Sequence, residues 1–201
     1  EQTASNIEEY MESYRFDLAA QSLQEFIWNE YCDWYVELSK PVLWDEENNP
    51  NEAQATRWML LNIMEKSLRL LHPFMPYITE EIWQRIAPML NIDGESIMLQ
   101  PYPQPDETNV DLNAEQGIEW IKGIIVAIRN IRGEMDISPA KAIPVFLNKG
   151  TASDQSRLEE YRPYLEKLAK LESIQWLKPD EEVPAAATQL HGDVEILVPM
   201  A

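Results

Sequence analysis

The side chains that most often carry out catalysis are scarce in this sequence. Its two histidines, His72 and His191, are far apart, and neither belongs to an HxxxH or HxH metal-binding spacing. The single cysteine, Cys32, has no histidine near it in the sequence to activate its thiol, so a packed side chain is the simpler interpretation. The GxxxxGKS/T, GxGxxG and GxSxG motifs of phosphate-binding loops and nucleophile elbows are absent. The sequence therefore predicts a segment that binds or scaffolds, with no catalytic residue, metal site or cofactor of its own.

One group of basic residues has a spacing that suits a polyanion. Lys122 and Arg129 are seven residues apart, which places them on the same helical face, and Arg132 follows three residues later. We expect them to form a basic ridge opposite a stripe of isoleucines, with Lys141 in the loop that follows. Such a ridge is able to contact RNA phosphates. The alternative that periodicity leaves open is a solvated face that pairs with nearby carboxylates.

The charge balance restricts the partners of the chain. Its 201 residues include 16 Lys and Arg and 35 Asp and Glu, which gives a net charge of −19. Because Lys and Arg supply most non-specific affinity for nucleic acid, this acidity argues against DNA as a partner, although it permits a local RNA-binding face. No apolar run reaches the ~18 residues of a membrane span, so we expect no membrane partner. One cysteine is typical of a reducing compartment, and we expect the protein in the cytoplasm.

Helical periodicity dominates the first hundred residues. Apolar side chains recur at steps of three and four, and this spacing predicts helices over 23–38, 52–71 and 76–87. We expect Pro41 to end the first of these helices and Trp58 to lie in the buried stripe of the second. The proline-rich segment 101–105 is predicted to be extended and to mark a domain boundary.

The pattern changes after this segment. The sequence predicts helices over 113–134 and 154–171, and strands over 142–147, 173–177 and 193–198. This order is typical of a small α/β module. The chain is therefore predicted to be mainly α-helical, with a helical bundle over 1–105 followed by a small α/β module over 106–201.

Three stretches of the sequence carry a resemblance to a known family. They are YRFDLAAQSLQEFIWNEYCDWYVELSKP (14–41), LLHPFMPYITEEIWQ (70–84) and AIRNIRGEMDISPAKAIPV (127–145), and they resemble the anticodon-binding region of the valyl-tRNA synthetase family. The L-x-P-F-x-P-x-x-x-E-E-x-W element is shared in looser form by the leucyl and isoleucyl enzymes, which remain an alternative. The resemblance implies an antiparallel helical bundle, as in the anticodon-binding domains of class I aminoacyl-tRNA synthetases.

The resemblance also implies a function for the whole enzyme, of which we expect this chain to be a fragment. That enzyme activates valine with ATP and esterifies it to tRNA(Val), so ATP is used by a catalytic domain that would precede Glu1. A basic coiled-coil arm would follow the 106–201 module. The expected partner is tRNA(Val), and the expected state is a monomer.

Within the chain, the resemblance points to the stretch 32–37 as the surface that meets the anticodon. Val36 is expected to make an apolar contact with a base, and Asp33 or Glu37 to accept a hydrogen bond from one. Arg15 and Lys40 flank this helix and are expected to contact phosphates. A further alternative belongs to another class: an acidic helical scaffold that binds protein partners and no RNA.

Overall fold

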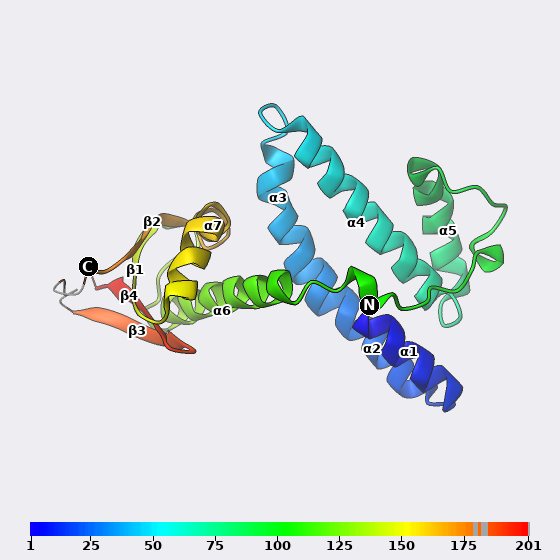
Figure 1. The fold of residues 1–201 in the computed structure, drawn as a ribbon, viewed down its shortest axis with the longest axis horizontal. Coiled ribbons are helices and arrows are strands. Elements are labelled where there is room, and N and C mark those ends of the chain that lie inside the picture. The colour runs from blue at the N-terminus through cyan, green and yellow to red at the C-terminus, as the bar shows by residue number, and fades with distance from the viewer. Residues whose placement is uncertain (179–180, 182–184, 201) are drawn as a thin grey trace. The chain divides into compact units, whose positions relative to one another are not determined.

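A computed structural model describes residues 1–178, 181 and 185–200, apart from the side chain of residue 107. The described chain is mainly helical, with a small mixed sheet towards its C-terminus (Figure 1). This confirms the predicted fold class at that level of detail. Backbone contacts divide the chain into two units, Glu1–Val110 and Asp111–Ala201.

The first unit is built from helices. They are α1 (Gln2–Glu12), α2 (Phe16–Glu25), a π-helix (Phe26–Tyr35), α3 (Val36–Trp44), α4 (Pro50–Leu71) and α5 (Pro76–Ile86), with short 3₁₀ turns at Ala87–Leu90, Ile97–Leu99 and Glu107–Asn109. Figure 1 shows α2, the π-helix and α3 as one uninterrupted path. The predicted end of this helix at Pro41 is wrong, because Pro41 lies inside α3. Its ring is buried there, and this burial offsets part of the cost of the missing backbone donor.

Two apolar clusters hold the first unit together. One lies between α1, α2 and the end of α4, and consists of Ala4, Ile7, Ala19, Leu23 and Leu70. The other joins α4 to α5 and the segment after it, and consists of Leu68, Trp83, Ala87 and Ile97. The prediction that Trp58 belongs to the core is wrong, because its side chain is 51% exposed. In this half of α4 the fully buried position is Ala53, and Trp58 lies on another side of the helix.

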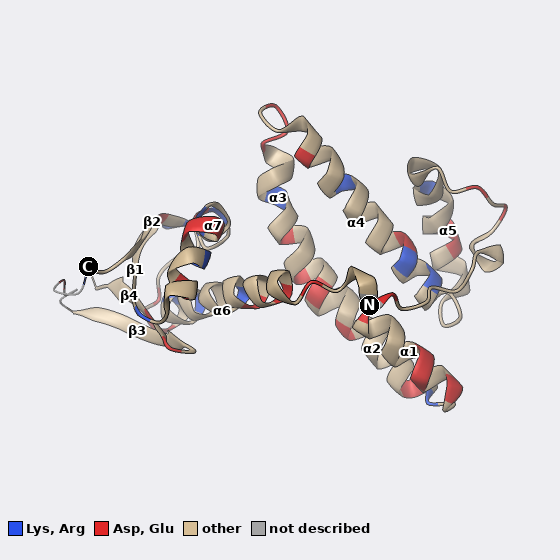
Figure 2. Ribbon diagram, in the orientation of Figure 1, with Lys and Arg blue, Asp and Glu red and all other residues tan. Residues whose placement is uncertain are grey.

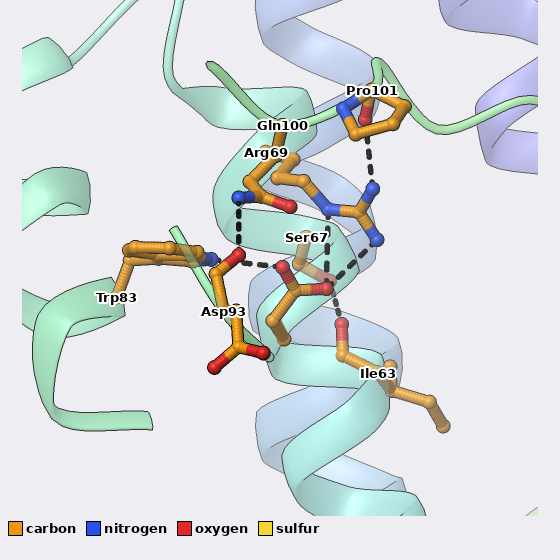
Figure 3. A network of polar contacts seen from close by, with 8 residues as sticks. Ile63, Ser67, Arg69, Trp83, Asp93, Gln100 and Pro101 are labelled. Carbon is orange, nitrogen blue, oxygen red and sulfur yellow. Dashed lines mark hydrogen bonds and ion pairs between the residues drawn. The ribbon is translucent and has the colours of Figure 1, made fainter. Parts of the chain in front are cut away.

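A buried carboxylate links α4 to α5 (Figure 3). Glu65 is 1% exposed, and its Oε1 accepts a hydrogen bond from Trp83 Nε1 at 2.9 Å. Its Oε2 accepts from Arg69 Nε at 3.1 Å and from Arg69 Nη2 at 2.8 Å. Arg69 Nη1 donates in turn to the carbonyl of Pro101 at 2.7 Å. This chain of contacts fixes the proline-rich segment 101–105 against α4.

In the residues described, the second unit is a four-stranded sheet with two helices. Its elements are α6 (Leu112–Glu134), β1 (Ile143–Lys149), α7 (Ala152–Leu168), β2 (Leu171–Trp176), β3 (Ala186–His191) and β4 (Val194–Pro199). The strand order is β2-β1-β4-β3; β1 pairs with β2 in parallel, whereas β4 is antiparallel to β1 and to β3. The parallel pair is connected through α7, as parallel strands require a crossover. The sequence prediction missed β3, an edge strand without a buried residue and with little apolar alternation.

Glycines on α6 allow close packing in this unit. The helix contacts β3, β4 and α7. A Cβ atom on Gly123 would lie 2.0 Å from the imidazole of His191, and one on Gly117 would lie 2.5 Å from the hydroxyl of Tyr161. A methyl group at either position would force the neighbouring ring to move.

Arg132 is the clearest departure from the sequence prediction in this unit. It is 6% exposed, and its Nη1 donates to the carbonyls of Ser138 at 3.1 Å and Lys141 at 2.9 Å. Its Nη2 donates to the carbonyls of Ala169 at 3.0 Å and Lys170 at 2.9 Å. Burial lowers the pKa of this guanidinium. The prediction that Arg132 lies on an exposed ridge is wrong, because two loops fold over it and their carbonyls need donors.

Replacing Glu65 should destabilise the first unit strongly. Glu65→Gln removes the charge opposite Arg69, and breaking one side of a buried ion pair typically costs ~3–5 kcal/mol. Glu81→Gln is the matched control, because Glu81 pairs with Arg85 on the surface, where such pairs contribute ~1 kcal/mol or less. Urea unfolding followed by tryptophan fluorescence measures both. Equal midpoints for the two variants would contradict a structural role of Glu65.

A second pair of variants tests the packing of α6. Gly123→Ala should destabilise the second unit by ~1–3 kcal/mol, since the new methyl group overlaps the His191 ring. Gly133→Ala lies in the same helix with nothing within 4 Å, and should instead stabilise it by up to ~1 kcal/mol. Thermal unfolding followed by circular dichroism distinguishes the expected loss of stability from the expected gain. A Gly123→Ala variant as stable as Gly133→Ala would mean that the His191 ring moves aside without loss of stability.

Candidate RNA-binding surface

The continuous helix from Phe16 to Trp44 carries four of the eight predicted site residues. Its inner side is anchored by Tyr31, which is buried and donates its hydroxyl hydrogen to the carbonyl of Leu60 on α4 at 3.0 Å. Burial, with a smaller influence of Cys32 and Tyr35, raises the pKa of Tyr31 to about 12. The hydroxyl therefore remains a donor at neutral pH and holds the π-helix in one rotation about its axis.

The outer side of this helix presents three charged residues and one valine. Asp33 is exposed, and Val36, Glu37 and Lys40 are half-buried. Lys40 Nζ forms an ion pair with Glu37 Oε1, one turn away. The structure thus brings Asp33, Val36, Glu37 and Lys40 together on one short stretch, within reach of a single ligand.

Arg15 is not part of this group. It precedes α2, at the opposite end of the continuous helix, where its Nη2 lies 2.8 Å from Asp17 Oδ2. The hydrogen bond from Arg15 lowers the pKa of Asp17 to about 2, so the pair is ionised under ordinary conditions. Both side chains are exposed, and the charge of Arg15 is partly compensated by its neighbour.

The predicted ridge on α6 does not form a continuous surface. Lys122 is largely buried, and its Nζ lies 2.6 Å from Glu119 Oε1. Arg129 is exposed and lines a shallow pocket with Arg132, Gly133, Asp136 and residues of the following loop. Of the three cations, only Arg129 is exposed, because Lys122 is largely buried beside Glu119 and Arg132 is buried.

Carboxylates predominate on the first helices. Figure 2 shows Asp and Glu residues along α1 and α2, whereas Lys and Arg are sparse there.

Among the described residues, no group of three or more His, Cys, Asp or Glu side chains is placed to hold a metal ion. In that same part of the chain, no helix combines the length and apolar character needed to cross a membrane.

Sequence reasoning did not select Trp28, an aromatic residue on the outer side of the π-helix. Its side chain is 60% exposed, and it lines a shallow pocket with residues of α2. The spacing of aromatic residues in this stretch favours burial, and only the three-dimensional structure distinguishes the buried Tyr31 from the exposed Trp28.

Sequence comparisons with known proteins find related tRNA ligases. The chain is 45% identical over 199 residues to the valine–tRNA ligases of Legionella pneumophila strains Lens, Paris and Philadelphia 1. These matches cover 99% of the chain but only 22% of each relative, so the chain spans about a fifth of their length. The family described as the anticodon-binding domain of tRNA ligase matches residues 1–147, which include every helix of the first unit. The chain therefore belongs to the family of anticodon-binding domains of tRNA ligases.

Proposed function

We propose that this chain is the part of a valine–tRNA ligase that binds the anticodon loop of tRNA(Val). The observation that carries the proposal is the 45% identity to valine–tRNA ligases, which extends over 99% of the chain. The names of these relatives favour the valyl enzyme over its leucyl and isoleucyl counterparts. Valine activation with ATP belongs to the remainder of such an enzyme, and no residue of this chain takes part in that reaction.

The proposed mechanism is recognition by a rigid surface. Proteins recognise single-stranded RNA loops by splaying bases onto apolar or aromatic side chains and hydrogen-bonding their edges. Val36 would contact a base, and the carboxylates of Asp33 and Glu37 would accept hydrogen bonds from base amino groups. Tyr31 fixes this helix to α4, and the Glu65 network fixes α4 to α5, so the surface is formed before RNA arrives and little binding energy is lost in ordering it.

Cations of the chain have a smaller part in this proposal. Lys40 and Arg15 remain proposed phosphate contacts, and each would exchange part of an existing ion pair for a phosphate. In the second unit, Lys122 and Arg129 remain proposed contacts with tRNA. Arg132 is not proposed as a contact, because it is buried. The antiparallel arrangement of the helices, the monomeric state and the cytoplasmic location also remain predictions.

A substitution at Val36 tests the proposal in the intact ligase. Val36→Asp places a charge where a base would pack, and the loss of a buried valine contact worth ~1.5–3 kcal/mol should raise the KM for tRNA by about 10- to 150-fold. Valine-dependent ATP–pyrophosphate exchange should stay unchanged, because that reaction does not involve the anticodon.

The control introduces the same charge elsewhere on the first unit. Ala55 is an exposed residue of α4, and Ala55→Asp should leave both reactions unaltered. Urea unfolding of the two variants reveals any loss of folding at the half-buried Val36. A Val36→Asp enzyme that loses exchange as strongly as tRNA charging would refute the assignment to the anticodon surface.

A further inference from the structure

Trp28 is an exposed indole in the π-helix, whose other aromatic residues are more buried. Its side chain is 60% exposed, whereas Tyr31, three residues later, is buried against α4. Trp28 belongs to neither of the apolar clusters of the first unit. A large ring in this situation contributes little to folding and leaves a flat π surface open to a ligand.

The side chains around Trp28 indicate the chemistry of that ligand. The shallow pocket that it lines also contains the amides of Gln21, Gln24 and Asn29 and the carboxylates of Asp17 and Glu25, together with Ala20. None of these lining residues is a cation, and the carboxylates disfavour a phosphate. Asp17 is already paired with Arg15, and Gln21 Nε2 already donates to Glu25 Oε1 at 2.8 Å. Amides donate and accept hydrogen bonds, and carboxylates accept them, which matches the edge of a nucleobase that carries an amino group.

The π-helix aligns Trp28 with the proposed anticodon surface. Its backbone bonds connect residues five apart, so residues at this spacing share a face. Trp28 and Asp33 are separated by five residues within the π-helix, and Asp33 and Glu37 by four at its junction with α3. In a regular α-helix of ~3.6 residues per turn, Trp28 and Asp33 would instead lie on different sides. The outer side therefore runs from an indole through two carboxylates to Lys40.

We propose that Trp28 is a stacking platform for one unpaired base of the tRNA anticodon loop. Gln24 and Asn29 would hydrogen-bond the edge of that base, and its neighbour in the loop would reach Asp33 and Val36. This inference rests on the proposed function, because it assumes that the ligand is tRNA. It adds a second contact point, about two helical turns away from Val36.

The test measures the affinity of the intact ligase for tRNA(Val) by filter binding at several salt concentrations. Trp28→Ala should weaken binding about 5- to 150-fold, the range expected for one lost stack. Trp28→Phe should restore most of the affinity, because it retains a ring. The slope of log K against log salt should stay unchanged in both, because no phosphate contact is removed.

Trp44→Ala is the matched control, because Trp44 is an exposed tryptophan at the far end of α3. Unaltered binding by both alanine variants would overturn the inference. Weaker binding by Trp28→Ala that phenylalanine does not restore, together with a lower urea midpoint than Trp44→Ala, would also overturn it in favour of packing. The Val36→Asp variant distinguishes failure of this inference from failure of the proposed function. If Val36→Asp weakens tRNA binding and Trp28→Ala does not, the anticodon surface stands without Trp28. If neither variant weakens tRNA binding, both proposals fail.

Discussion

The first unit depends on the satisfaction of one buried charge. Removing a carboxylate from water costs several kcal/mol, and this cost is met only when hydrogen bonds replace the lost hydration. Glu65 has such partners because Trp83 approaches from α5 and Arg69 lies one turn away on α4. The position of α5 on α4 is therefore set by a directional contact and not by apolar packing alone. The same arginine holds Pro101, so the segment that leaves the helices is fixed by the same group.

In the second unit, buried carbonyl groups need hydrogen-bond donors, and a buried cation supplies them. Four carbonyls from two loops converge on the guanidinium of Arg132 near the end of α6. A carbonyl buried without a donor costs ~1–3 kcal/mol, so one residue removes several penalties at once. The planar guanidinium, with five donors in a fixed geometry, suits this role better than an ammonium group would. A basic residue that looks suited to RNA in the sequence is thus used to close the loops beside the sheet.

An acidic chain is able to bind RNA when its surface contacts the bases and not the phosphates. The outer side of the helix from Phe16 to Trp44 offers an indole, amides and carboxylates, and Lys40 is already paired with Glu37. Such a surface gains affinity from stacking and from base-edge hydrogen bonds, which depend little on salt. In the proposed ligase, most attraction for the phosphate backbone would then come from outside this chain.

The sequence alone was sufficient for the features that depend on local preference. Asp111 caps α6 by accepting from the backbone of Asn113 and Ala114, and the isoleucine repeat that follows predicted this helix almost to the residue. The alternating apolar residues of β1 and β4 likewise predicted those strands. Short motifs were enough to identify the family, which the comparison over residues 1–147 confirmed.

Only the tertiary structure decided the rest, namely the π-helix, the path through Pro41, the exposure of Trp28 and Trp58, and the burial of Arg132. Periodicity reveals which residues avoid water, but it does not reveal which distant segment covers them. Tyr31 faces inward because Leu60, on another helix, offers a carbonyl, and Arg132 is buried because loops ending at Lys141 and Lys170 close over it. Tyr31 and Arg132 each bond to a residue that is distant in the sequence, and the chain must fold before these partners meet.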